Sequence, residues 1–406
     1  MEKKWLLILS ALLVLLIIGG LFFFFFSGKS NPLNDAGDDG SIGLLRFLGL
    51  SGNKDIDTDG SPPPSPTPGP GTTPDGPGDG TGQKEARLIQ ITTKGVIGPA
   101  LTKDGAGISY YVRAGGNLEE MALDGKNVRI VSPLTILGMF DVLWSPTRTK
   151  SVLSYADDDL AKRFISEPGG GSPVVFLPQA LTATAWSPDG TSLAYFLPQG
   201  TANTNLVVAS HDGKNPKVVY STPIPDLTLF WPTKTTILLP SRPSGIAPGV
   251  LFSFNTNTKA ATVVLDSAYG LTILPSPKGT AMLYAVTNDR GRDPSLFLAN
   301  ITGESATKVS VTTLPEKCVF TTNEFFAYCA IPKNIASFSI LPDDWYMGVG
   351  FFEDRLIKID TKTLATETVF DERSFDMTNM FLSSDEQHLF FQDKHDNTLW
   401  RLRIVP

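Results

Sequence analysis

The stretch WSPDGTSLAYF, residues 186–196, joins an aromatic residue, a tight-turn tetrapeptide and an apolar run without a gap. Ser187, Pro188, Asp189 and Gly190 are the residue types of a type I turn, because proline presets φ at the second position and glycine closes the turn. The flanking segments LTATAW and SLAYF have the β-branched and aromatic composition of strands. The stretch therefore predicts a β-hairpin, and its proline and glycine disfavour a short helix.

The hairpin pattern recurs along the chain. Aligned on Trp186, further copies start at Leu101, Trp144, Trp231, Pro275, Cys318 and Leu382, at successive intervals of 43, 42, 45, 44, 43 and 64 residues. A second turn pattern follows most starts by about 25 residues, as in LDGKN, HDGKN and ITGES. Four short strands with this period are typical of a β-propeller blade. The sequence predicts an all-β, seven-bladed propeller of four-stranded antiparallel blades in residues 85–406.

The last copy supplies only three strands. Residues 86–93 form an extra strand before the first copy, and we expect this strand to pair with residues 398–404. Such a closure removes two open sheet edges, which would otherwise invite pairing with other chains.

The W-S-P-D-G pattern followed by a strand resembles the TolB-like, WD-repeat-like propeller repeat. The resemblance covers residues 86–406 and is strict only at residues 186–196. It implies a propeller; TolB itself is a periplasmic partner-binding protein with six blades and a separate N-terminal domain, so its partners are not carried over. The residues expected to shape the repeat and its turns are Trp144, Trp186, Pro188, Asp189, Gly190 and Trp231.

The chain begins with a predicted membrane anchor. Residues 5–26 are an uncharged apolar run of 22 residues, long enough as a helix to cross a bilayer. Lys3 and Lys4 place residues 1–4 in the cytoplasm as a short stub. A cleaved signal peptide is the alternative, although its apolar stretch is usually ~7–15 residues. Residues 27–84 are rich in Pro, Gly and Asp and predict a flexible linker, which leaves the propeller outside the cytoplasm.

The two cysteines flank a predicted hairpin. Cys318 and Cys329 enclose VFTTNEFFAY, so a four-residue turn sets them opposite each other on neighbouring strands. We expect a disulfide, because the predicted location is oxidising. Two buried thiols in the propeller core are the alternative.

Several classes of site are not indicated by the sequence. The histidines His211, His388 and His395 lie in or beside proposed turns, and no G-x-S-x-G nucleophile pattern occurs. A hydrolase domain of the oligopeptidase type would need further residues beyond the propeller. We therefore expect no enzymatic activity, no cofactor and no metal site. The acidic stretches 157–159 and 288–294 are interpreted as solvated loops, and a net charge of −7 disfavours nucleic-acid binding.

An insertion lengthens the sixth interval. About twenty extra residues fall within residues 331–352, on the propeller face that carries the loops between the second and third strands. Asp343, Asp344, Trp345 and Tyr346 combine aromatic anchors with acidic neighbours, as partner-binding sites often do. In the alternative interpretation, the insertion folds down and caps its own blade with Trp345 buried.

These observations predict a membrane-tethered, monomeric, extracytoplasmic propeller that acts as a protein-binding or scaffolding module. One alternative is a carbohydrate- or peptide-binding sensor with a pocket at the channel mouth. Another is a lyase or hydrolase hosted by the propeller.

Overall fold

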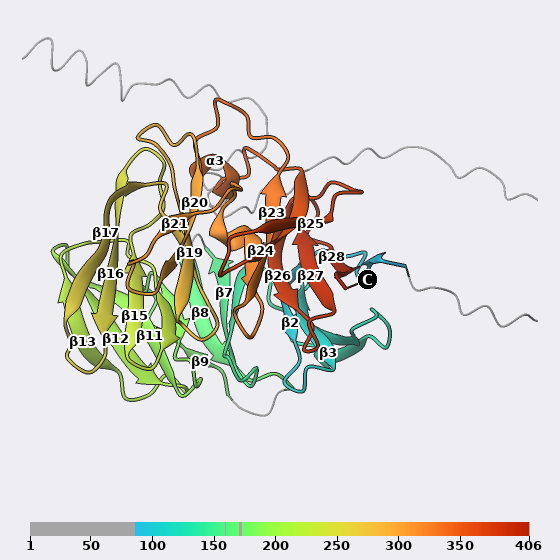
Figure 1. The fold of residues 1–406 in the computed structure, drawn as a ribbon. Coiled ribbons are helices and arrows are strands. Elements are labelled where there is room, and N and C mark those ends of the chain that lie inside the picture. The colour runs from blue at the N-terminus through green and yellow to red at the C-terminus, as the bar shows by residue number, and fades with distance from the viewer. Residues whose placement is uncertain (1–85, 159, 170–172, 406) are drawn as a thin grey trace, which may run out of the picture. The chain divides into compact units, whose positions relative to one another are not determined.

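The computed structural model describes residues 86–158, 160–169 and 173–405. In this part of the chain, seven antiparallel sheets of four strands each follow one another, which confirms the predicted seven-bladed propeller (Figure 1). The predicted stub, membrane anchor and linker, residues 1–84, lie outside the described residues. No helix among the described residues is long and apolar enough to span a membrane.

Blade 1 contains β2 (Val96–Leu101), β3 (Gly107–Val112), β4 (Leu118–Ala122) and β5 (Arg129–Ser132). Blade 2 contains β6 (Met139–Trp144), β7 (Ser151–Asp157), β8 (Leu160–Ser166) and β9 (Val175–Phe176). Blade 3 contains β10 (Thr184–Trp186), β11 (Ser192–Gln199), β12 (Asn203–Ser210) and β13 (Lys217–Thr222). Blade 4 contains β14 (Phe230–Thr233), β15 (Thr236–Pro240), β16 (Pro248–Asn255) and β17 (Ala261–Tyr269). Blade 5 contains β18 (Thr272–Pro275), β19 (Ala281–Val286), β20 (Ser295–Asn300) and β21 (Thr307–Lys308).

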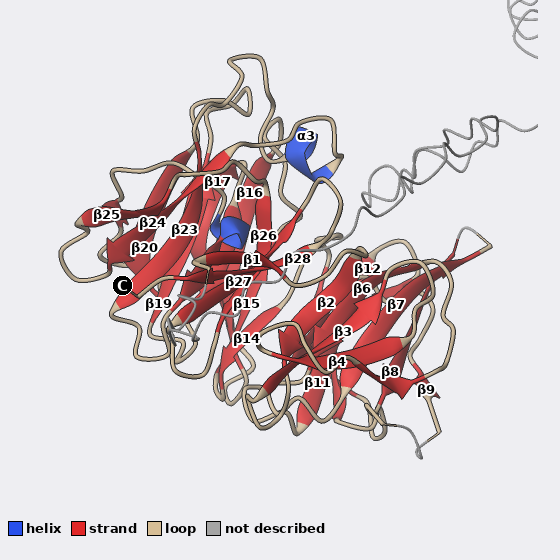
Figure 2. Ribbon diagram, turned by 90° about the vertical axis from the view of Figure 1, so that its right-hand side faces the viewer, coloured by secondary structure: helices blue, strands red, loops and turns tan. Residues whose placement is uncertain are grey.

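Blade 6 follows the 3₁₀ turn η1 (Pro315–Lys317) and contains β22 (Cys318–Phe320), β23 (Phe326–Pro332), β24 (Asp354–Asp360) and β25 (Thr366–Phe370), with the short helix α3 (Asp343–Tyr346) between β23 and β24. Blade 7 contains β26 (Met377–Leu382), β27 (His388–Asp393), β28 (Leu399–Arg403) and, as its fourth strand, β1 (Leu88–Gln90). Figure 2 shows α3 beyond the ends of the strands.

The ring closes as expected from the sequence. β1 pairs antiparallel with β28, and Leu88 lies opposite Leu402. Arg87 extends the pairing, because its carbonyl accepts the N–H of Arg403 at 2.8 Å. The first strand of the described chain thus completes the last blade and covers its edge.

The Ser-Pro-Asp-Gly stretch forms the predicted turn. The hydroxyl of Ser187 accepts the N–H of Ser192 at 2.9 Å, and Gly190 donates its N–H to the carbonyl of Ser187 at 2.8 Å. Gly190 has φ of +69°, a conformation that glycine adopts without a steric penalty. Six blades share this hydrogen bond, in which the hydroxyl of a Ser or Thr at the start of the turn accepts the backbone N–H of the residue five positions later. The accepting residues are Thr102, Ser145, Ser187, Ser276, Thr321 and Ser383.

Two blades depart from the alignment made on the sequence. In blade 4, Thr233 pairs with Thr236, so only two residues connect the first two strands. In blade 6, Thr321 opens the turn, and the residue equivalent to Trp186 is therefore Phe320 rather than Cys318. The sequence alignment was two residues out of register in this degenerate copy.

The repeat tryptophans connect neighbouring blades. The indole Nε1 of Trp144 donates to the carbonyl of Gly98 in blade 1 at 2.7 Å, and that of Trp186 donates to Leu143 in blade 2 at 3.0 Å. Both side chains are buried. Trp231 is partly buried, and its Nε1 has no hydrogen-bond partner in the described part of the chain. At Trp144 and Trp186, tryptophan therefore stabilises the contact between successive first strands.

The predicted disulfide is present. Cys318 and Cys329 are directly opposite residues of β22 and β23 and form a disulfide, with their Cα atoms 4.1 Å apart. This distance is close to that of the narrow, non-hydrogen-bonded type of antiparallel pair. Both residues are buried in the apolar cluster between blades 5 and 6.

Candidate functional site

The insertion of blade 6 lies across the face that carries the loops between second and third strands. The Oδ2 atom of Asp343 accepts the N–H of Gly245 in blade 4 at 2.6 Å, and Leu341 donates its N–H to Gly291 in blade 5 at 2.8 Å. A Cβ atom on Gly245 would lie only 2.4 Å from the Leu341 carbonyl oxygen, so the close approach requires glycine. Contacts to other blades therefore hold the insertion in place.

Trp345 of the insertion is 6% exposed, and its side chain is buried against the propeller. Its Nε1 donates to the Asp376 carboxylate of blade 7 at 3.1 and 3.2 Å, and its ring stacks on Phe352 with centroids 6.2 Å apart. This burial leaves Trp345 unavailable as the exposed anchor expected from the sequence. The observed arrangement is that of the alternative interpretation, in which the insertion folds down onto the propeller.

The other three candidate residues of the insertion also make internal contacts. Asp343 holds Gly245, Asp344 Oδ2 accepts the N–H of Ile340 at 2.7 Å, and the Tyr346 hydroxyl donates to Glu316. A carboxylate or hydroxyl that is already paired has less to gain from a partner. Contact with a protein partner stays a prediction.

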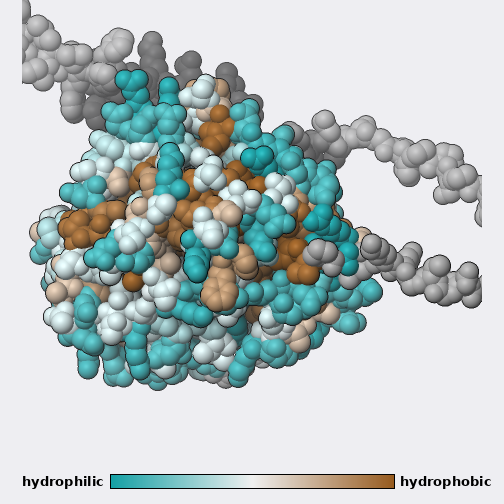
Figure 3. Space-filling view, viewed as in Figure 1, coloured by the Kyte–Doolittle hydropathy of each residue, from teal (hydrophilic) through white to brown (hydrophobic). Residues whose placement is uncertain are grey.

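Apolar side chains of the insertion do remain at the surface, including Phe338 and Val349. Figure 3 shows hydrophobic areas interspersed with hydrophilic ones on the face it presents. Exposed residues of this kind, rather than Trp345, are the ones accessible to a protein partner.

A buried ionic cluster underlies the insertion. Lys317 is fully buried, and its Nζ lies 2.9 Å from Asp354 and 2.5 Å from Asp376. Asp354 also accepts the N–H of Met377 at 2.7 Å, and Asp376 accepts that of Phe352 at 3.1 Å. Burial raises the pKa of Asp354 to about 6, although Lys317 acts against the increase. The cluster joins blades 6 and 7 where the insertion lies.

Two cavities lie beside α3, and Tyr346 and Met347 line both of them. The first, called the apolar cavity, has a volume of about 460 Å³ and is lined by blades 4 and 5, η1 and the insertion. The second, called the basic cavity, has a volume of about 620 Å³ and is lined by blades 7, 1 and 2 and the insertion. Both volumes are in the range of small-molecule sites.

The basic cavity gathers cationic and amide side chains from loops and from strands of blade 7. Lys394 and His395 belong to the loop between β27 and β28, and Arg113 belongs to the loop between β3 and β4. The amides that line it are Asn379, Gln392 and Asn397. Because these loops emerge on one face of the propeller, residues distant in sequence converge at the channel mouth.

The cations of this cavity are partly dehydrated. Burial lowers the pKa of Lys394 to about 8, partly offset by Asp376, and burial also lowers the pKa of Arg113. Lys394 Nζ lies 4.0 Å from the centre of the Trp345 ring and donates to the Trp345 carbonyl. A partly buried cation whose pKa is lowered gains free energy when an anion approaches it.

Two further groups of this cavity modulate its charge. Asp141 also lines the cavity, and desolvation raises the pKa of its carboxyl, while a backbone hydrogen bond and Arg163 act against the increase. The Nδ1 atom of His395 lies 2.6 Å from Asp393, and its ring stacks on Phe351 with centroids 4.9 Å apart. Asp141 is therefore an acidic group beside the cations Lys394 and Arg113 in this cavity.

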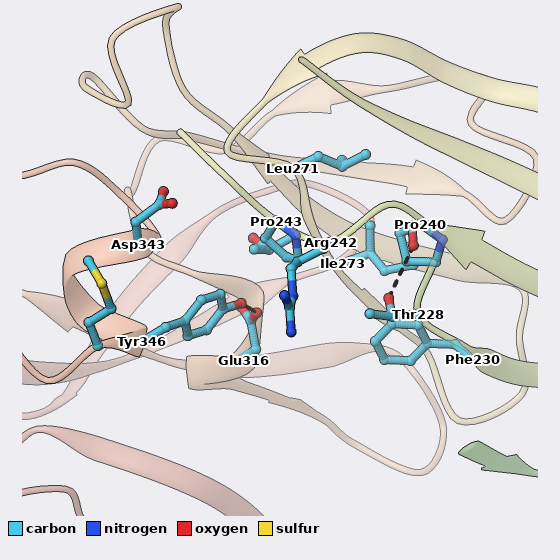
Figure 4. A pocket seen from close by; sticks show the side chains of 12 residues that line it. Thr228, Phe230, Pro240, Arg242, Pro243, Leu271, Ile273, Glu316, Asp343 and Tyr346 are labelled. Carbon is cyan, nitrogen blue, oxygen red and sulfur yellow. Dashed lines mark hydrogen bonds between the residues drawn. The ribbon is translucent and has the colours of Figure 1, made fainter. Parts of the chain in front are cut away.

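The apolar cavity has a different lining. Phe230 and Ile273 come from the first strands of blades 4 and 5, and Tyr346 comes from α3 (Figure 4). Glu316 of η1 lies beside the Tyr346 hydroxyl, which donates to its Oε1 atom (Figure 4). The cavity thus combines an apolar wall with the carboxyl groups of Glu316 and Asp343 and the guanidinium of Arg242.

Sequence reasoning did not select Lys394, Arg113 or Glu316. The sequence could have indicated Lys394 and Arg113 by their position in the repeat, because both lie between the second and third strands of their blades, as the insertion does. Of the acidic stretches, Asp157 is the last residue of β7 and residues 288–294 lie between β19 and β20. Among the described residues, neither stretch contributes to a metal-binding group. Asp157 forms an ion pair with Lys162.

Neither the known protein families nor the curated proteins match this sequence. Among solved structures, the chain is similar to oligogalacturonate lyase from Vibrio parahaemolyticus, with 10% identity and a TM-score of 0.58 over 80% of this chain and 95% of the lyase. It is also similar to an oligogalacturonate lyase in complex with manganese, with 12% identity and a TM-score of 0.54 over 78% of this chain and 93% of that lyase. A TolB protein from Agrobacterium tumefaciens, at 14% identity over 54% of this chain and 86% of that one, has a TM-score of only 0.37. Identities this low establish the fold alone.

One expectation from the sequence is corrected by these similarities. We expected no enzymatic activity, because no catalytic domain accompanies the propeller. The Vibrio lyase is an enzyme, and the alignment covers 95% of its chain. A propeller of this architecture therefore does not need an additional domain for catalysis, and the exclusion was wrong.

The similarity to a manganese complex raises the question of a metal site. Manganese prefers carboxylate and other oxygen ligands, together with imidazole. The described residues contain no group of three or more His, Cys, Asp or Glu side chains that could hold a metal ion. They do not fit such a site, and nothing proposed below involves a metal.

Proposed function

We propose that the propeller binds a carboxylate-bearing saccharide in the basic cavity. The observation that carries the proposal is the convergence of Lys394, Arg113 and His395 on one cavity at the channel mouth. Hydrogen bonds from charged donors to a carboxylate are roughly twice as strong as neutral ones. The partly dehydrated Lys394 and Arg113 are suited to this interaction.

The remaining lining suits a sugar. Amide groups of Asn379 and Asn397 can exchange hydrogen bonds with hydroxyl groups, whereas Phe140 and Phe351 offer apolar surface to a sugar ring. The similarity to oligogalacturonate lyase supports the same ligand class, because the name of that enzyme specifies an acidic oligosaccharide. Attachment of the propeller to a membrane, through residues 5–26, remains part of the proposal.

Calorimetric titration of the full chain tests the proposal. We expect trigalacturonate to bind, and the neutral trisaccharide maltotriose to bind at least about tenfold more weakly, because it lacks the carboxylates. Arg113→Gln should weaken trigalacturonate binding by a similar factor. Arg129→Gln, on the exposed outer strand of the same blade, is the matched control and should have no effect. Equal affinities for the two saccharides would overturn the proposal.

Elimination at a bound uronate is a second candidate function. The observation that favours it is Lys394, whose pKa of about 8 leaves a substantial neutral fraction at mildly alkaline pH. A neutral amine can accept the proton next to the carboxylate, while the bond to the leaving sugar oxygen breaks and that oxygen takes up a proton. The expected signal is the ultraviolet absorbance of the unsaturated product, rising with pH through 8 and lost in Lys394→Gln.

A further inference from the structure

The apolar cavity is separate from the basic cavity in both lining and charge. The two share only Tyr346 and Met347, and none of the cationic residues of the basic cavity lines the apolar one. The ligand of this second cavity can therefore be inferred independently of saccharide binding.

The shape and lining of the cavity suit an apolar molecule. The wall includes Phe230, Leu271 and Ile273, and Tyr346 of α3 lies on the opposite side (Figure 4). Its volume of about 460 Å³ exceeds that of a few water molecules and is sufficient for a small ring or alkyl chain. Burying such a group removes apolar surface from water, which favours binding.

Two buried polar atoms of the lining lack partners. The Oε2 atom of Glu316 and the Oγ1 atom of Thr272 are buried and have no hydrogen-bond partner within the described chain. Thr272 is only 2% exposed. Glu316 Oε1, by contrast, accepts a hydrogen bond from Tyr346. Leaving such atoms unpaired is unfavourable, so a ligand that forms hydrogen bonds with them gains free energy.

The charge of the lining favours a cation. Glu316 and Asp343 contribute two carboxyl groups, against the single guanidinium of Arg242. Burial raises the pKa of Glu316, while the Tyr346 hydrogen bond and Lys317 lower it. A positively charged donor beside Oε2 would stabilise the ionised form of this carboxyl.

We propose that the apolar cavity binds a small primary amine, with its apolar body against Phe230 and Ile273. Its ammonium group donates to Glu316 Oε2 and Thr272 Oγ1. An ammonium is matched to this site because it offers several donors and no acceptor. A carboxylate of the same size is excluded by repulsion from Glu316 and Asp343.

The test compares three probes of similar shape on the full chain by calorimetric titration: 2-phenylethylamine, 2-phenylethanol and 3-phenylpropionate. We expect the amine to bind at least about tenfold more tightly than the alcohol, since hydrogen bonds to charged groups contribute more than neutral ones. The carboxylate should not bind. Equal affinities for amine and alcohol, or no binding of the amine at millimolar concentration, would overturn the proposal.

Variants locate the site. Glu316→Gln keeps the shape of the side chain and should abolish the preference for the amine over the alcohol. Glu353→Gln, an exposed residue of the same blade, is the matched control and should retain it. Thr272→Val should weaken the amine several-fold. An unchanged amine affinity in Glu316→Gln would contradict the assignment, and if that variant does not fold, the wild-type probe comparison and Thr272→Val decide.

Discussion

Blade 3 and blade 6 are built from the same repeat but stabilised in different ways. In blade 3, Asp189 lies in an exposed turn, and hydrogen bonds from Ser187 and Thr191 lower its pKa to about 2. In blade 6, Lys317 and Asp354 are fully buried, and their partner Asp376 comes from blade 7. The polar contacts of the blade 3 turn are local in sequence, whereas those of blade 6 cross between blades.

The difference shows where function can be placed on a repeat. A local turn closes one hairpin and can be repeated without reference to its neighbours. The buried cluster of blade 6 instead supports α3, which lies beside both cavities. The irregular blade therefore shapes the site, and the regular blades provide its scaffold.

The largest expected difference concerns the buried lysine. Lys317→Met removes the cation paired with the buried carboxylates of Asp354 and Asp376, which should lower the free energy of unfolding by about 3–5 kcal/mol. Lys214→Met in blade 3 removes an exposed pair with Asp212 and should cost less than about 1 kcal/mol. Chemical denaturation measures both. Similar losses in the two variants would show that blade 6 is not held by its buried cluster.

The next effect concerns the covalent bond within blade 6. Replacing Cys318 and Cys329 together by alanine should lower the free energy of unfolding by about 3 kcal/mol, because the unfolded chain regains its freedom. A reducing agent should destabilise the wild type and leave the double variant unchanged. Blade 3 has no such link between the equivalent residues Thr184 and Tyr195. Insensitivity of the wild type to reduction would contradict a structural role for the disulfide.

The two blades should also respond to pH in opposite directions. The folded-state pKa of Asp354 is raised to about 6, so its contribution to stability is present below the unfolded pKa of about 4 and is lost as pH rises through 6. Relative to Asp354→Asn, the wild type should therefore lose roughly 2 kcal/mol between pH 4 and pH 6. Denaturation of both proteins at each pH measures the difference, and a constant difference would contradict the assignment.

The smallest effect is expected in the blade 3 turn. Asp189→Ala removes hydrogen bonds of an exposed residue and should cost no more than about 1 kcal/mol at neutral pH. Because the pKa of Asp189 is lowered to about 2, its contribution is present above the unfolded pKa of about 4 and lost as pH falls through 2. Melting curves of wild type and variant should therefore converge in acid, whereas a loss comparable to that of Lys317→Met would remove the contrast between the blades.

The sequence alone was sufficient for the architecture. The turn at Ser187 and its copies depend on residues within a few positions of one another, and so does the pairing of Cys318 with Cys329. The fourth strand of blade 7 was also predictable, because an incomplete last copy and an extra first strand leave one way to close the ring. The error of two residues in the alignment fell on blade 6, where the hairpin pattern is degenerate.

The candidate site was decided by the tertiary structure. In the sequence, Trp345 is the residue type expected of an exposed anchor. In the structure it is buried, and Asp376, 31 residues away, accepts its indole N–H. Lys394 and Arg113 meet at the channel mouth only because the ring closes, and Glu316 becomes a buried, half-paired carboxyl only because α3 lies beside it. Local patterns determine strands and turns through short-range hydrogen bonds and steric preferences, whereas burial and charge at a site depend on which distant loops the closed ring brings together.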